Sequence, residues 1–311
     1  MRTNLLSGPG VFTQPGYSGT EEGGDREEVD FCSVLNRNLP DDIRVTAWAA
    51  APRQDFSARF DCESRSYHYY FPRGNLDVER MEVAGSKLVG GHDFRNLCKM
   101  DVNNGVVSFV RRVDSVRVDV IDWENENGRD ECEQSGYDIC RLTIKSKAFL
   151  WHQIRCIVAV LFMIGEGLEE ADVIDQLLDI ETNPCRPAYS MASDLPLNLY
   201  RTEYTGLDWH RGTGTPDNSE LTIKTLQKLW TEHAVKAAII RGKLWELEAG
   251  DERKMLAQTE GLLFRRREKS YTKLMDLPRC PSLEDKIKTI AKKRKIELPT
   301  AEAAGEEDGD E

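Results

Sequence analysis

The sequence predicts an α+β fold in which an antiparallel or mixed sheet packs against helices. Several short runs alternate apolar and polar residues, which is typical of strands. Others repeat apolar residues every three or four positions, which is typical of helices. The two kinds follow one another without a regular strand–helix–strand repeat, so a parallel sheet is not expected. At 311 residues, the chain can hold one large domain or two modest ones.

The first part of the chain predicts little structure before residue 31. Residues 1–30 are rich in Gly, Ser, Pro and Glu and predict a disordered acidic leader. A turn at residues 39–41 and a strand through Val45 and Trp48 follow. Tyr67 to Phe71 is rich in aromatic residues and predicts another strand.

The next seventy residues predict a helix, a loop and a strand. Residues 77–89 form a helix candidate, with the two glycines that follow it as its stop. Residues 90–101 mix polar and apolar positions and predict a loop. Residues 109–121 alternate as a strand, and residues 122–136 predict an acidic turn region.

The stretch 141–165 predicts a strand that runs into a helix. Leu142 and Ile144 share one face of the strand, and from about Trp151 the apolar spacing changes to that of a helix packed on the sheet. Gly165 and Gly167 are natural helix stops.

The remainder predicts mainly helices. Residues 170–180 form a short amphipathic helix, and residues 190–204 form a last strand. This divides the chain into the leader 1–30, a domain over 31–204, a helical basic extension over 205–296 and a disordered acidic tail over 297–311. The extension begins with a linker at 205–220 and contains a long helix at 222–247.

Charge is segregated along the chain. The net charge is −12, and it comes almost entirely from the two acidic ends, whereas residues 265–295 are strongly basic. Such segregation is compatible with binding a polyanion through part of the surface; ordinary solvated faces are the alternative. No apolar run is long enough to span a bilayer. The eight cysteines form no CxxC pair, which argues against a zinc site or a disulfide framework and favours the nucleus or cytoplasm.

A basic cluster surrounds the junction between the strand and the helix of residues 141–165. It contains no acidic residue and comprises Lys145, Lys147, His152, Gln153 and Arg155. Cations and free backbone N–H groups converge there, which favours a site that faces an anion. The alternative is a core helix whose polar residues cap and solvate its first turn.

Five blocks stand out along the chain. They are LNRNLP at 35–40, DFSARFDCESRSYHYYF at 55–71, GGHDFRNLCKMD at 90–101, KAFLWHQIRCIVAVLFMIG at 147–165 and LPLNLYRTEY at 195–204. In their order and spacing, these blocks resemble the TruA family of tRNA pseudouridine synthases. The sequence HDFRNLCKMD and the later KLMDLPRC are most similar to the eukaryotic branch that modifies positions 38 and 39 of the anticodon arm.

The resemblance implies an isomerase that acts on uridine in tRNA without cofactor or metal, around a central basic cleft. It implies that Tyr67 stacks on the uracil and that Arg59 lines the cleft. It further implies that His152, Gln153 and Arg155 belong to the site and that Leu197 packs beneath the base. Without the family, Tyr67 is equally well a core aromatic and Arg59 equally well a surface ion pair.

Basic side chains near these blocks are candidates for contacts with RNA phosphates, which position the RNA without reading its sequence. They are Arg65, His68, Arg73, Lys145 and Lys147.

The resemblance also implies an aspartate nucleophile in a G-R-T-D-x-G-V block before LNRNLP, and the sequence has no such block. The nearest string is Met1-Arg2-Thr3-Asn4, with an amide in place of the carboxylate, and Asp25 and Asp30 stand in another context. We therefore expect an amino-terminally truncated or alternatively spliced product, or an incomplete gene model, that does not make pseudouridine as written.

Three hypotheses follow for function. The first is a tRNA pseudouridine synthase by family, with tRNA as partner and no membrane. The second is a catalytically dead tRNA-binding fragment. The third is an interaction module that binds a protein through the helix at 222–247. A homodimer is compatible with the sequence, and the modified uridine and the choice between nucleus and cytoplasm stay open.

Overall fold

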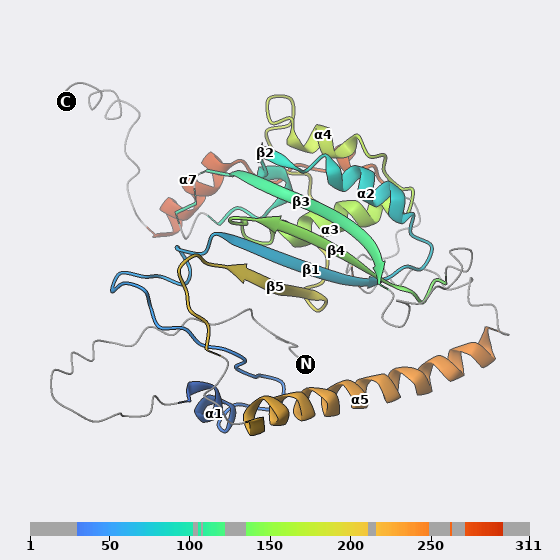
Figure 1. Ribbon diagram of the computed structural model, residues 1–311. Helices are drawn as coiled ribbons and strands as arrows, with labels where there is room; N and C mark the ends of the chain where they lie inside the picture. The colour runs from blue at the N-terminus through green and yellow to red at the C-terminus, as the bar shows by residue number, and fades with distance from the viewer. Residues whose placement is uncertain are drawn as a thin grey trace.

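The computed structural model describes residues 30–101, 105–106, 108–121, 135–210, 216–248, 262 and 271–294. Its centre is a five-stranded sheet in the order β2-β3-β4-β1-β5, in which all neighbouring strands are antiparallel (Figure 1). The strands are β1 (Ser64–Pro72), β2 (Gly90–Asp93), β3 (Val110–Ile121), β4 (Ile139–Ser146) and β5 (Leu197–Glu203). The predicted α+β class is confirmed.

Alternation along β1 gives the sheet two unlike faces. Tyr67 pairs with Ile144 of β4, and Tyr69 pairs with Leu142, which places these apolar side chains on one face. His68 and Tyr70 lie between them in sequence and therefore point to the opposite face. The apolar face forms the core.

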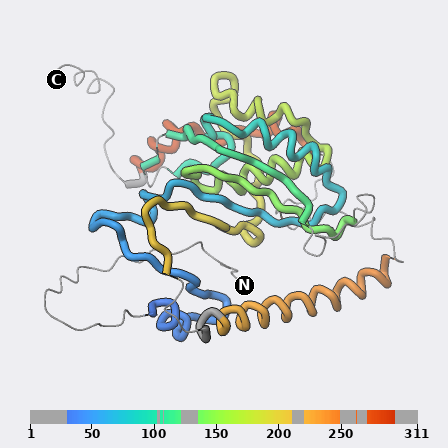
Figure 2. The backbone as a smooth tube through the Cα atoms, viewed as in Figure 1, coloured from blue at the N-terminus to red at the C-terminus, as the bar shows by residue number. Residues whose placement is uncertain are grey.

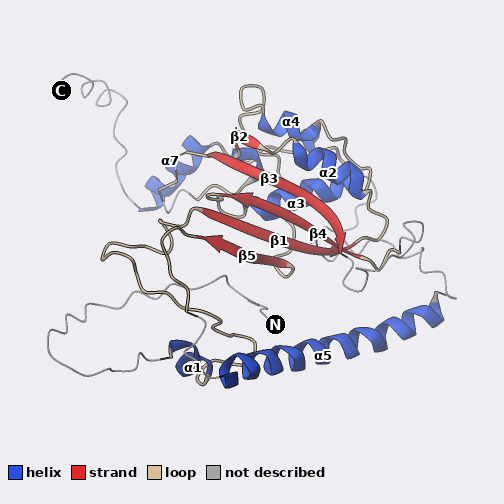
Figure 3. Cartoon of the chain, viewed as in Figure 1, coloured by secondary structure: helices blue, strands red, loops and turns tan. Residues whose placement is uncertain are grey.

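Helices cover that apolar face (Figure 3). They are α2 (Val78–Ser86), α3 (Gln153–Gly165) and α4 (Val173–Leu178). Helix α3 is buried along almost its whole length. Its Phe162 ring lies 6.0 Å from the Tyr69 ring and 5.0 Å from the Phe71 ring, so α3 fixes the position of β1.

The carboxyl-terminal part of the described chain has two different environments. Helix α5 (Pro216–Leu247) runs apart from the sheet and is exposed over much of its surface. The segment that follows contains the short turn η4 (Leu274–Asp276) and helix α7 (Leu283–Arg294), on the same side of the sheet as α2 and α4 (Figure 2). The buried Leu274 joins this segment to the core.

Most predicted elements are confirmed with shifts of a few residues. The predicted helix at 77–89 is α2, which begins after Asp77, whose side chain accepts a hydrogen bond from the Arg80 N–H. The predicted strands at 109–121 and 190–204 are β3 and β5. The predicted strand and helix of 141–165 are β4 and α3, and the helix at 170–180 is α4.

Three predictions differ from the structure, and two helices had no predicted bounds. The predicted linker at 205–220 is shorter, because α5 already begins at Pro216. The stretch through Val45 and Trp48 is not a strand, because only Trp48 forms a ladder pair, an isolated bridge with His210. Residues 90–101 are not simply a loop: they form β2, which pairs with β3, and the turn η1 (Arg95–Leu97). Helix α1 (Phe31–Asn36) was not predicted, and α7 lies within the predicted helical extension at 205–296, in which no separate helix was predicted at those residues.

Parts of the prediction lie outside the described residues. These are the leader to residue 29, residues 122–134 of the acidic turn region, residues 211–215 of the linker and the tail from 295. Within the described segments, no helix combines the length and hydrophobicity that crossing a bilayer requires.

Candidate functional site

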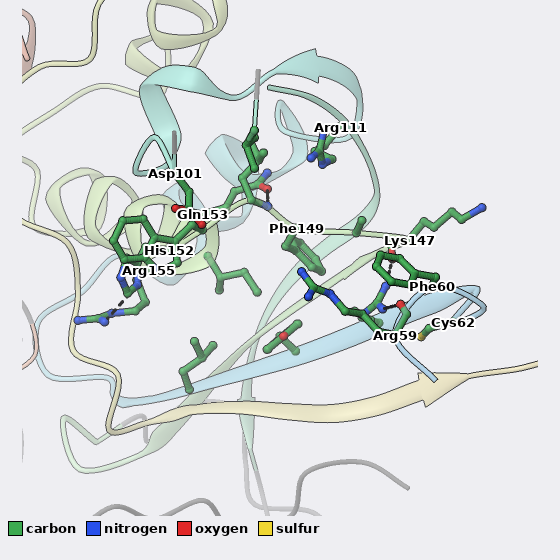
Figure 4. Close-up of a pocket in the computed structure, with 18 residues that line it drawn as sticks. Arg59, Phe60, Cys62, Asp101, Arg111, Lys147, Phe149, His152, Gln153 and Arg155 are labelled. Atoms are coloured by element: carbon green, nitrogen blue, oxygen red, sulfur yellow. Dashed lines mark hydrogen bonds between the residues drawn. The ribbon is translucent and has the colours of Figure 1, made fainter. Parts of the chain in front are cut away.

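A pocket of about 660 Å³ opens where β1 begins, β4 ends and α3 starts (Figure 4). Its size lies within the usual range for small-molecule and nucleotide sites. Segments that are distant in sequence meet there because β1 and β4 are antiparallel neighbours, so that the start of one lies beside the end of the other. The pocket is therefore a consequence of the sheet topology.

The pocket has an apolar floor. It includes Tyr67, Phe149 and Leu197. The Tyr67 and Phe149 rings meet edge to face with centroids 5.3 Å apart. Burial raises the pKa of the Tyr67 phenol, and the nearby Arg65 only partly opposes this rise. Tyr67 is therefore a neutral, half-buried ring that a planar base can cover.

The turn before α3 brings strained backbone to the pocket wall. His152 has φ +56°, the one positive value for a non-glycine residue in the described part of the chain. The Gln153 Oε1 accepts a hydrogen bond of 2.8 Å from the Leu150 N–H and holds this turn closed. Gln153 Nε2 is buried without a hydrogen-bond partner in the structure.

Arg155 is fixed from two sides at the same wall. Its Nε donates to the Ala192 carbonyl at 2.7 Å, and its Nη1 lies 3.4 Å from His152 Nδ1. Burial lowers the pKa of His152, and the positive charges of Arg155 and Lys99 lower it further. The wall therefore presents a guanidinium beside an imidazole that is neutral at pH 7.

Arg65 ties together the two rims on the other side of the pocket. Its Nη1 donates to the Lys147 carbonyl and its Nη2 to the Arg59 carbonyl, both at 2.5 Å. The start of β1 thus holds both the loop before it and the loop after β4. The Arg59 guanidinium lies 5.3 Å from the centre of the Phe60 ring on the same rim.

Three cations of the pocket have no ion pair among the described residues. Among the described residues, no carboxylate lies within ion-pairing distance of Arg59, Arg111 or Lys147. By contrast, Lys145 pairs with Glu203 at 2.9 Å on the opposite face of the sheet. The positive charges of these three side chains are therefore available to bind an external anion.

The structure brings most of the predicted site residues together. Those that line the pocket are Arg59, Arg65, Tyr67, Lys147, His152, Gln153, Arg155 and Leu197. Arg65 is occupied by the two backbone carbonyls described above.

Three predicted phosphate contacts lie elsewhere. His68 points to the opposite face of the sheet from Tyr67. It is 5% exposed, because its ring stacks there on Tyr200 with centroids 4.0 Å apart. Lys145 points to that same face, where it forms its ion pair with Glu203. Arg73 follows the far end of β1, away from the pocket.

The described aspartates do not supply the block that the resemblance implies. Asp30 caps α1, accepting hydrogen bonds from the Ser33 N–H and hydroxyl, and does not line the pocket. Asp25 and Asn4 lie outside the described residues. Asp101 is the one acidic residue among the described lining residues. No group of three or more His, Cys, Asp or Glu in the described segments is placed to hold a metal ion.

Several residues that line the pocket were not predicted from the sequence. They are Phe60, Asp101, Arg111, Phe149 and Trp151. Phe60 and Trp151 are large exposed side chains, and each stands next in sequence to a predicted site residue. That adjacency was the available signal. Asp101 ends the block at 90–101 but was not singled out, whereas Arg111 reaches the pocket only through tertiary contacts, which no local pattern reveals.

Comparison with known proteins gives consistent matches. A family model described as tRNA pseudouridine synthase matches residues 84–205. The tRNA pseudouridine(38/39) synthase of Homo sapiens is 40% identical over 291 residues, covering 88% of this chain and 59% of the human protein. The protein of the same name from Saccharomyces cerevisiae is 38% identical over 216 residues, covering 69% and 46% respectively.

An archaeal protein also matches, over a shorter part of the chain. The tRNA pseudouridine synthase A of Methanocorpusculum labreanum is 36% identical over 155 residues, half of this chain and 48% of the archaeal protein. The chain spans about 59% of the length of the human relative.

Proposed function

The chain belongs to the TruA family of tRNA pseudouridine synthases, and from that membership we propose that its pocket binds a uridine of tRNA for conversion to pseudouridine. The relatives named for positions 38 and 39 support a target in the anticodon arm. In this conversion the N1–C1′ bond breaks, the uracil turns, and a C5–C1′ bond forms while C5 loses its hydrogen as a proton and N1 gains a proton. No atom is gained or lost overall.

One observation carries the proposal: an apolar, aromatic floor is surrounded by cations without carboxylate partners. Tyr67 and Phe149 offer surface to a planar base, and Arg59 and Lys147 offer charge to phosphates. A uridine inside an RNA stem cannot reach such a floor while stacked, so the nucleotide must leave its stack and enter the pocket. A flat base flanked by phosphates fits both features.

The residues at the α3 wall would then orient the base. The fixed guanidinium of Arg155 donates hydrogen bonds and carries a charge that never titrates at physiological pH. The neutral His152 adds one N–H donor. Uracil carbonyls are acceptors, so both groups suit the base, while Leu197 contacts its apolar surface.

The decisive experiment incubates the purified chain with tRNA that carries tritium at C5 of its uridines. Tritium release from an anticodon arm with uridine at 38 or 39, and its loss in Tyr67→Leu, supports the proposed reaction. Tight binding of that arm without release supports a tRNA-binding protein that does not catalyse. Failure to bind any tRNA contradicts both and leaves protein interaction through α5 as the alternative.

We further propose that two copies associate through α5. The helix is 32 residues long, and several of its large apolar side chains are exposed, which is costly for a lone helix in water. They include Ile223, Trp230, Ile239, Ile240 and Trp245. Light scattering should give twice the chain mass for wild type and the single mass for a Trp230→Glu/Ile240→Glu variant. A wild-type monomer contradicts the association.

We also propose that the chain acts in the nucleus, the cytoplasm or both, where tRNA is processed and used. The seven described cysteines are all free thiols, which supports a reducing compartment. Imaging of the tagged full chain would test this, and residence in a secretory compartment would contradict it.

A further inference from the structure

Phe60 is a large apolar side chain that the fold holds out into solvent. The residue is 77% exposed, yet it lines the rim of the pocket. Figure 4 shows it beside Lys147 and Arg59, across the pocket from His152 and Arg155. Exposure alone indicates nothing about Phe60, because single exposed apolar residues are common on protein surfaces. Its position at the pocket mouth suggests a ligand that covers it.

The loop that carries Phe60 is fixed by hydrogen bonds. The Ser57 N–H donates to Asp61 Oδ2 at 2.7 Å, and the Tyr204 hydroxyl donates to the Ala58 carbonyl at 2.7 Å. Arg65 donates to the Arg59 carbonyl, immediately before Phe60. The ring is thus presented by a preorganised loop, so that less conformational entropy is lost when a ligand binds.

The immediate surroundings of the ring are cationic. The Arg59 guanidinium lies 5.3 Å from the ring centre, and Lys147 lines the same side of the pocket. Neither cation has an ion pair among the described residues, as noted above. An exposed aromatic ring beside unpaired cations is the arrangement with which proteins bind single-stranded nucleic acid, one base on the ring and its phosphate on the cation.

We propose that Phe60 stacks on the base next to the uridine that occupies the pocket. The inference rests on the proposed function and adds a positioning residue to it. When a uridine leaves its stack, its neighbour loses a stacking partner. The Phe60 ring replaces that partner, and Arg59 beside it holds the intervening phosphate. The open conformation of the RNA is thereby stabilised.

The test uses the full chain and two anticodon stem-loops that carry 2-aminopurine immediately 5′ or 3′ of the target uridine. This base fluoresces brightly when unstacked and weakly when stacked. With wild-type protein, one of the two probes should stay quenched on binding. With Phe60→Ala that probe should brighten and affinity should fall about tenfold. Phe60→Trp should restore both the quenching and the affinity.

Tyr200→Ala is the matched control, because Tyr200 is also an exposed aromatic residue but stacks on His68 on the opposite face of the sheet. It should leave fluorescence and affinity unchanged. Circular dichroism should show that each variant is folded, as expected when an exposed side chain is changed. If Phe60→Ala binds with wild-type affinity and quenching, the stacking role is overturned while tRNA binding stands. If the wild-type chain binds neither stem-loop, the proposed function fails and the stacking role with it.

Discussion

Arg155 Nη1 lies 3.4 Å from His152 Nδ1, and this contact selects one protonation state of the histidine. A guanidinium has only donors, so Nδ1 must be the acceptor. The imidazole is then neutral with its proton on Nε2, in agreement with the lowering of the His152 pKa by burial and by the nearby positive charges. The pocket wall therefore combines one permanent cation with one neutral donor.

Acid should destabilise the fold through His152. Its pKa is lower in the folded chain than in the unfolded chain, so between the two values the unfolded state binds more protons and stability falls as pH falls. Above the ordinary histidine value of about 6.5, both states are neutral and the effect vanishes. The free energy of unfolding, measured with urea, should fall less between pH 7.5 and pH 5.5 in His152→Asn than in wild type. Asparagine suits the positive φ there, and His68 remains in both proteins as an internal control. Equal losses in the two proteins would refute this assignment.

Two lysines only two residues apart should differ in their effect on RNA binding. Lys147 lines the pocket and has no ion pair in the described structure, whereas Lys145 pairs with Glu203 on the opposite face. Lys147→Met should weaken stem-loop binding and reduce the slope of log affinity against log salt by about one. Lys145→Met should leave the slope unchanged. A reduced slope in Lys145→Met alone would indicate that the RNA binds to the opposite face of the sheet.

Arg65 should act by holding the pocket rims. Its guanidinium donates to the carbonyls of Lys147 and Arg59, so its removal frees both loops. We expect Arg65→Met to lower the free energy of unfolding by about 1 kcal/mol, since hydrogen bonds to a partly exposed charged group are worth little more. Binding should weaken while its salt slope stays at the wild-type value. A slope reduced by about one would restore the initial expectation that Arg65 contacts a phosphate.

The sequence allowed much of the fold to be predicted, because strands and helices with one buried face carry a period. β3, β4 and α3 have long, regular apolar patterns, and their prediction was confirmed. β2 was missed because its four residues begin with two glycines and gain their stability only from pairing with β3. The Val45–Trp48 stretch had a strand-like composition but finds only one isolated partner, at His210.

The site was only partly predictable for a similar reason. The family motifs located Tyr67, His152 and Arg155, but motifs do not say which face a neighbour occupies. Strand alternation separates His68 from Tyr67, because neighbouring residues of a strand point to opposite faces of the sheet. Arg111 joins the pocket because β3 pairs with β4, and such long-range pairing is invisible in a local pattern.

Two glycines in helices should respond oppositely to alanine. A Cβ at Gly165 would lie 2.7 Å from Met81 Sδ and 3.1 Å from Leu76 Cδ2, where α3 passes close to α2. Gly165→Ala should therefore cost about 1–3 kcal/mol of stability, because the buried Met81 has little space to move. Among the described residues, no atom outside the adjoining backbone of α5 lies within 4 Å of such a Cβ at Gly242, and Gly242→Ala should stabilise by about 0.5–1 kcal/mol through helix propensity. Urea unfolding of both variants tests the contrast, and a neutral Gly165→Ala would show that the helices can separate without cost.

Glu169 should hold the carboxyl-terminal segment on the core. Glu169 is 5% exposed, and its Oε1 accepts hydrogen bonds from the Tyr271 hydroxyl at 2.7 Å and from the Leu274 N–H at 2.6 Å. Glu169→Ala removes the carboxylate acceptor from the Leu274 N–H and leaves the Tyr271 hydroxyl with weaker contacts such as Met163 Sδ at 3.4 Å, so it should cost about 3 kcal/mol. Amide hydrogen exchange should accelerate throughout residues 271–294 and much less in β4. Glu170→Ala is the matched control, since that side chain is mostly exposed and its ion pair with Arg80 should contribute less than about 1 kcal/mol. Unchanged exchange at 271–294 in Glu169→Ala would mean that Leu274 and its apolar neighbours alone hold the segment in place.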